Sequence, residues 1–93
     1  MVVLIVERVS PSLRGLLSRW LIQPRVGVFV GNVSALVRDK LWEKATRSLK
    51  RGGAILIHSS NTEQGFAIRT AGDPGRLIED FDGLLLVKTP LAG

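Results

Sequence analysis

Apolar residues in this chain alternate between short continuous runs and longer stretches with helical spacing. Residues 2–6 are all valine, leucine or isoleucine, a run too short for an isolated helix and typical of a buried strand. Ser10 and Pro11 follow as an N-cap and first-turn pair. The next apolar residues are spaced three or four apart, so the pattern predicts an amphipathic helix over residues 11–22 that Pro24 ends.

The middle of the chain predicts a strand, a long helix and a hairpin. Residues 25–31 alternate with the period of a strand, and residues 35–51 form a helix that Asn32 or Ser34 caps and that ends before two glycines. Residues 54–59 and 66–70 are strands joined by a polar loop. The segment between the two helices fits either one bent strand or a hairpin, and the pattern leaves both open.

The last part of the chain predicts an irregular connector over residues 71–83, followed by an apolar strand at about 84–88 with the reach to pair with another subunit. Two helices and four or five strands in 93 residues make one domain, residues 1–93. We therefore predict an α+β ferredoxin-like sandwich, with two helices on one face of a small antiparallel sheet and an extra C-terminal strand.

Each predicted helix has an apolar face and a basic face. The apolar faces include Trp20 in the first helix and Leu36 and Trp42 in the second, which we expect to be buried. The basic face of the second helix has the spacing to follow a phosphate backbone, although a solvated face explains it equally well. It consists of Lys40, Lys44, Arg47 and Arg51.

Charge is distributed unevenly along the chain. The net charge is +5, and residues 1–51 contain ten Lys and Arg against three acids, whereas residues 52–93 contain three against five. A basic first half favours a polyanionic partner such as nucleic acid. No apolar run is long enough to span a bilayer and no cleavable leader pattern is present, so we expect a soluble cytoplasmic protein.

Candidate chemistry centres on Glu7, a carboxylate at the carboxyl end of the first strand. With no Cys and a single His, any metal would be held by oxygen ligands, which favours Mg²⁺ or Mn²⁺. One carboxylate is too few for a metal site, but a two-fold dimer would bring Glu7 and its symmetry mate together. No nucleotide-binding loop or nucleophile elbow is present, and His58 at a strand end is ordinarily structural.

A set of short motifs, in order along nearly the whole chain, resembles the small spacer-acquisition subunit of type I-E CRISPR systems. The motifs are Glu7, residues 11–15, Trp20-Leu21, residues 25–34, Trp42-Glu43, residues 60–66 and Asp82-Gly83-Leu84.

The resemblance implies a ferredoxin-like homodimer that binds duplex DNA and bridges two dimers of the CRISPR integrase, which performs the strand transfer. It implies that Arg14, Arg25, Arg38 and Arg76 contact the DNA backbone. It also implies that a C-terminal segment docks against integrase and the neighbouring subunit, here Leu84, Leu85, Leu86 and Val87.

Two other interpretations stay open. Members of the family are described as metal-dependent endoribonucleases or deoxyribonucleases with an Asp ligand at the end of the first strand, where this chain has Glu7, so the alternative is an endonuclease that uses paired Glu7 and Mg²⁺ or Mn²⁺. A single-stranded RNA binder fits the charge, but such sheets stack bases on aromatic residues, and few are present. Its candidates would be Phe29 and Phe66.

Overall fold

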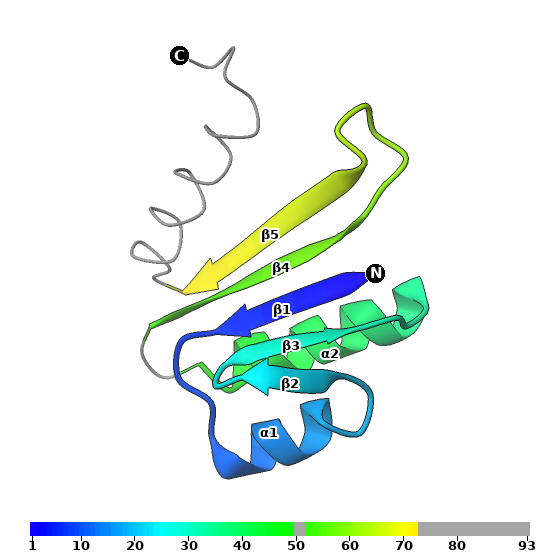
Figure 1. Cartoon of the computed structure of the whole chain (residues 1–93). Coiled ribbons are helices and arrows are strands. Elements are labelled where there is room, and N and C mark those ends of the chain that lie inside the picture. Colours follow the sequence, from blue (N-terminus) through cyan, green and yellow to red (C-terminus); the bar gives the residue numbers. More distant parts are fainter. Residues whose placement is uncertain (50–51, 73–93) are drawn as a thin grey trace.

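The computed structural model describes residues 1–49 and 52–72, which form five strands and two helices (Figure 1). Their order along the chain is β1 (Val2–Val6), α1 (Pro11–Leu17), β2 (Ile22–Arg25), β3 (Val28–Gly31), α2 (Ala35–Arg47), β4 (Gly53–Ser59) and β5 (Phe66–Gly72). None of the helices in these ranges is long and apolar enough to cross a bilayer.

The strands form one sheet in the order β2-β3-β1-β4-β5, and every neighbouring pair is antiparallel. The apolar run of β1 lies in the centre of the sheet, which explains why it has no polar residue on either side. The units β1-α1-β2 and β3-α2-β4 are two βαβ units, and the β2–β3 hairpin joins them along the chain. This arrangement is the predicted ferredoxin-like α+β fold, to which β5 adds a strand beyond β4.

Both helices lie on the same side of the sheet (Figure 1). Alternate residues of the strands face them, because successive side chains of a strand point to opposite faces. The core between the layers is closed by fully buried side chains from every layer, including Leu4 of β1, Phe29 of β3, Leu17 of α1 and Ala45 of α2. The prediction of two helices on one sheet face is confirmed.

The segment between the helices is a hairpin, one of the two alternatives that the sequence left open, and residues 25–31 are divided between β2 and β3. The helix predicted to reach residue 22 is wrong. α1 ends at Leu17, and β2 turns into β3 at Gly27, whose φ is +81°. A Cβ at this glycine would lie 2.5 Å from the carbonyl oxygen of Val6, so only glycine fits there. Pro24 does not end a helix but lies in edge strand β2, where a missing N–H is tolerated.

Two of the apolar side chains predicted to be buried are exposed. Trp20 is 52% exposed because it follows the end of α1, and Leu36 is 67% exposed in the first turn of α2. Trp42 packs against the core as predicted. The second helix ends at Arg47, before the predicted end at residue 51.

The face of the sheet opposite the helices carries an apolar row that crosses all five strands. Directly paired residues lie on the same face, and the register places Ile22, Val30, Val3, Ile57 and Ile68 side by side from β2 to β5. Ile22 is 75% exposed and Ile68 is 38% exposed. We call these five residues the apolar row; no helix of the described ranges covers it.

Candidate nucleic-acid interface

Glu7 closes the joint between β1 and the start of β4. Its backbone N–H donates to the carbonyl of Gly53 at 3.0 Å, and the N–H of Gly53 donates to Oε2 of the Glu7 side chain, also at 3.0 Å. A Cβ on the neighbouring Gly52 would come within 2.6 Å of the same carboxylate oxygen. The carboxylate singled out by the sequence therefore has a structural partner within its own chain.

These contacts do not make a metal site within one chain. Mg²⁺ and Mn²⁺ take several oxygen ligands, and the described residues contain no group of three or more His, Cys, Asp or Glu side chains suited to hold a metal. One oxygen of Glu7 already accepts the N–H of Gly53. Within residues 1–49 and 52–72 the donor set does not fit a resident metal ion, and the predicted role of Glu7 as a ligand shared by two subunits stays a prediction.

Arg14 and Arg25 lie toward the end of the sheet at which β1 finishes. Arg14 is an exposed residue of α1, the helix that begins just after β1. Arg25 is exposed at the end of β2, and the adjoining turn is tied to β1 because Val6 donates to the carbonyl of Gly27 at 2.8 Å. Neither arginine takes part in a salt bridge with the described residues. Both side chains are exposed, as contacts to a polyanion require.

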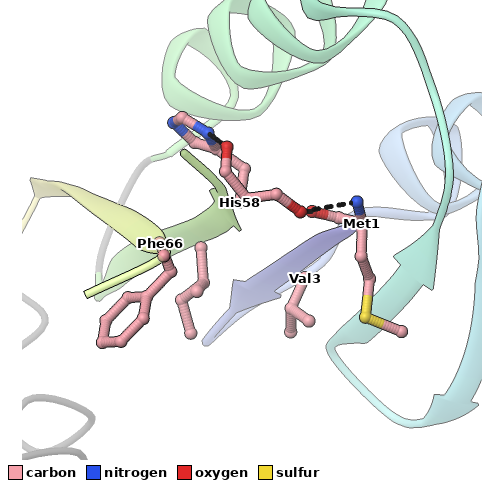
Figure 2. A pocket seen from close by; sticks show the side chains of 7 residues that line it. Met1, Val3, His58 and Phe66 are labelled. Carbon is pink, nitrogen blue, oxygen red and sulfur yellow. Dashed lines mark hydrogen bonds between the residues drawn. The ribbon is translucent and has the colours of Figure 1, made fainter. Parts of the chain in front are cut away.

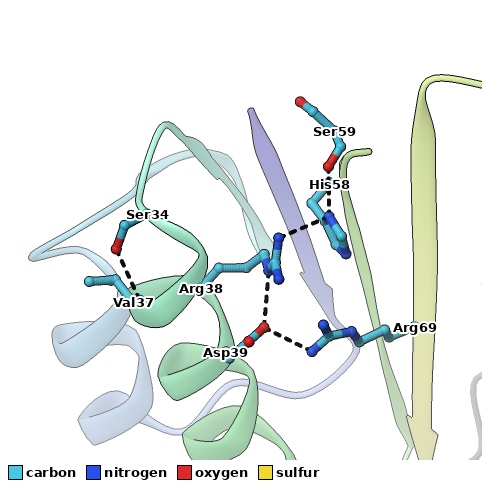
Figure 3. Close-up of polar contacts among 7 residues, drawn as sticks. All are labelled: Ser34, Val37, Arg38, Asp39, His58, Ser59 and Arg69. Atoms are coloured by element: carbon cyan, nitrogen blue, oxygen red, sulfur yellow. Dashed lines mark hydrogen bonds and ion pairs between the residues drawn. The ribbon is translucent and has the colours of Figure 1, made fainter. Parts of the chain in front are cut away.

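Arg38 lies at the opposite end of the sheet and is already engaged. Its Nε donates to Oδ1 of Asp39 at 3.0 Å, and its Nη1 lies 3.1 Å from Nδ1 of His58 on β4 (Figure 3). The Arg38 side chain is only 16% exposed. The structure thus brings Arg14 and Arg25 toward one end of the sheet and separates Arg38 from them.

Three residues around Arg38 were not singled out as binding residues by the sequence. Asp39, His58 and Arg69 join it in a cluster in which Arg69 of β5 donates from Nη1 to the same Oδ1 of Asp39, at 3.0 Å (Figure 3). We call these four residues the arginine cluster. The sequence gives one signal for this cluster. Arg69 alternates with Ala67 and Ala71 along β5, so the three side chains share one face of the strand, and this face is the helix side of the sheet.

The two guanidinium groups hold the pKa of Asp39 below its ordinary value. The largest cause is the hydrogen bond from Arg38, and the charge and hydrogen bond of Arg69 add to it. The carboxylate of Asp39 therefore stays ionised and keeps both arginines directed at one oxygen.

A small open pocket of about 150 Å³ lies at the Met1 end of the sheet. Its lining side chains include Val3 and Phe66, while the ring of His58 points to the other side of the sheet (Figure 2). The N-terminal amine donates to Oγ of Ser59 at 2.9 Å beside it. The pocket has room for an apolar side chain rather than for a nucleotide.

The aromatic residues give little support to a base-stacking sheet. Phe29 is completely buried between the sheet and the helices, so it offers no face to a base. Phe66 is partly buried at the pocket. Arg76 and the predicted docking residues Leu84, Leu85, Leu86 and Val87 lie outside the described residues.

A family model described as CRISPR-associated protein (Cas_Cas2CT1978) matches residues 1–86, which include every strand and helix described above.

Proposed function

The chain belongs to this family of Cas2-like CRISPR-associated proteins and has a role in CRISPR adaptation; we propose that it acts there as a homodimeric scaffold for duplex DNA. The observation that carries the proposal is the family match over residues 1–86. The resemblance to the type I-E spacer-acquisition subunit supports the finer assignment, in which the dimer bridges two integrase dimers in the cytoplasm.

Duplex binding is supported by where the cations lie. Arg14 and Arg25 are exposed and form no ion pair with any described residue, and ten of the thirteen Lys and Arg residues occur in residues 1–51. Contacts from such side chains to phosphates fix the position of a duplex without reading its sequence. A scaffold that accepts many different spacer sequences needs binding of this kind.

Dimer formation is supported by the apolar row. Ile22 and Ile68 leave apolar surface at its two ends, and β-branched side chains fill the positions between them. A second copy of the chain, related by a two-fold axis, would offer the same row in return, and such self-complementary contacts are characteristic of symmetric dimers. The C-terminal residues Leu84, Leu85, Leu86 and Val87 are proposed to add the contacts to integrase and to the neighbouring subunit.

Binding and cleavage can be measured in the same samples. Labelled duplex DNA is titrated with the protein between about 50 and 200 mM salt, with Mg²⁺, with Mn²⁺ and with a chelator, and the products are then separated on a denaturing gel. We expect an affinity that falls linearly with salt on logarithmic axes and no cleavage. Arg14→Gln combined with Arg25→Gln should weaken binding and reduce the salt slope by about two units, because two phosphate contacts are lost.

Two variants control this experiment. Arg19→Gln removes an exposed cation that is not assigned to the DNA, so it should leave the salt slope unchanged. Glu7→Gln keeps an oxygen acceptor for the N–H of Gly53 but removes the charge that a metal would need. Metal-dependent cleavage by the wild type that disappears in Glu7→Gln would establish the nuclease alternative instead.

A further inference from the structure

The arginine cluster contains more hydrogen-bond donors than its contacts within the described chain use. A guanidinium has five N–H groups, and Arg38 and Arg69 together use three nitrogen atoms in contacts to Asp39 and His58. Arg69 is 40% exposed and Asp39 is 49% exposed, so the cluster opens to solvent. With two arginines and one ionised Asp39, it carries a net positive charge.

Stability alone does not account for this arrangement. Exposed ion pairs contribute little to folding because water and salt screen them. Yet side chains from α2 and β5 converge on the single oxygen Oδ1 of Asp39, at 3.0 Å each. Two guanidinium groups held side by side form a preorganised site for an oxyanion, with Asp39 as the residue that positions them.

His58 allows Arg38 to change partners at low cost. Nδ1 of His58 lies 3.1 Å from Nη1 of Arg38 and 2.9 Å from the carbonyl oxygen of Ser59. A ring nitrogen either accepts a hydrogen bond or donates one, so it cannot satisfy both neighbours at once. If Arg38 turns toward an anion, Nδ1 of His58 can donate to the Ser59 carbonyl instead of accepting from Arg38. The ring nitrogen then keeps one hydrogen bond.

We propose that the arginine cluster binds a backbone phosphate of duplex DNA, at a contact point separate from Arg14 and Arg25. The proposal rests on the proposed function, because it takes the duplex as the source of the phosphodiester. Arg38 and Arg69 donate to the phosphate oxygens, and Asp39 sets their positions while its charge moderates the affinity. The cluster lies where β1 begins and toward the β5 edge of the sheet, whereas Arg25 lies where β1 finishes and on the β2 edge, so one duplex bound at both points would run diagonally across the strands.

The two signs of charge in the cluster give opposite predictions. Arg69→Gln should weaken duplex binding about 5-fold and reduce the salt slope by about one unit, because one phosphate contact is lost. Asp39→Asn should strengthen binding about 3-fold, since it removes the negative charge that faces the phosphate. The matched control is Arg19→Gln, which removes an exposed arginine that is assigned to neither contact point.

The measurement is fluorescence anisotropy with a DNA duplex and an RNA duplex of the same sequence, with the melting temperature of each variant recorded. Unchanged affinity and slope in Arg69→Gln, while the wild type binds, would overturn the cluster as a site and leave the proposed function standing. Weaker binding in Asp39→Asn together with a lowered melting temperature would also overturn it, because the cluster would then act only through the fold. A loss confined to the RNA duplex contradicts the assignment to DNA. Failure of the wild type to bind any duplex overturns the proposed function itself, and this site with it.

Discussion

Glu7 and Gly53 are joined by two hydrogen bonds of 3.0 Å, one from the Glu7 N–H to the Gly53 carbonyl and one from the Gly53 N–H to the Glu7 carboxylate. The pair fixes the end of β1 to the start of β4 at the point where α2 has just ended. A carboxylate that looks catalytic in the sequence thus has a demonstrable structural task.

Removing the Glu7 side chain should lower the free energy of unfolding. Glu7→Ala leaves the part-buried N–H of Gly53 without its acceptor, which costs about 1–2 kcal/mol. Glu7→Gln should cost less, because its side-chain oxygen can still accept. Urea unfolding of the three proteins tests this, and equal stability of wild type and Glu7→Ala would contradict the structural role.

Gly52 should tolerate alanine worse than Gly65 does. Both have a positive φ, +77° and +80°, so each alanine pays about 1–2 kcal/mol for the left-handed backbone. Only at Gly52 would the new Cβ also meet Glu7, at 2.6 Å from Oε2, whereas nothing lies within 4 Å at Gly65. Gly52→Ala should therefore be the less stable variant by about 1 kcal/mol or more.

A double variant isolates this contact. In Glu7→Ala combined with Gly52→Ala the obstructing carboxylate is gone, so the combined loss of stability should be smaller than the sum of the single losses. Strict additivity in thermal or urea unfolding would show that the two residues do not interact.

The pKa of Asp39 should rise when its main partner is removed. Arg38→Gln takes away the hydrogen bond that contributes most to the lowered pKa, and NMR titration of the side-chain carboxyl carbon reports the change. Because the folded pKa is depressed, the stabilisation by the cluster is present above the ordinary Asp pKa and is lost as the pH falls through the folded value. The wild type should therefore be more stable than Asp39→Asn near neutral pH, and the stabilities of the two proteins should converge in acid.

Placing a charge on the apolar row should separate the proposed dimer. Ile22→Glu or Ile68→Glu puts a carboxylate at an end of the row, and an unpaired charge in an apolar interface should raise the dimer dissociation constant at least about 100-fold. Leu36→Glu is the control, because Leu36 is 67% exposed on α2, on the other side of the sheet. Sedimentation equilibrium measures the dissociation constant of the wild type and of the three variants. A monomeric wild type would contradict the dimer and mean that something other than a second copy covers the apolar row.

The sequence predicted the central strand and both helix starts because their signals are local. The apolar run ends in charge at Glu7, and Ser10 and Ser34 cap the helices by accepting from Leu13 and Val37. The β2–β3 hairpin was not resolved because Pro24 is equally compatible with the end of a helix and with an edge strand. What decides between them is the approach of Gly27 to Val6, a contact across 21 positions of sequence.

The sequence could predict a site residue only where the position of that residue in one helix or strand decides whether its side chain is exposed. Arg14 on α1 is exposed as its helical position indicates. The partners of Arg38 depend on sheet register, which brings β5 residue Arg69 to Asp39 across 30 positions. No periodicity in either segment specifies that meeting, so the cluster could be found only in the folded chain.

Sedimentation velocity of the full chain with a short fluorescent duplex measures directly whether a dimer of this chain holds one DNA duplex. We expect a complex of two chains per duplex that dissociates as salt increases, with the DNA intact in Mg²⁺. A single chain on the duplex, no complex at any salt concentration, or DNA cut in the presence of the metal would contradict it.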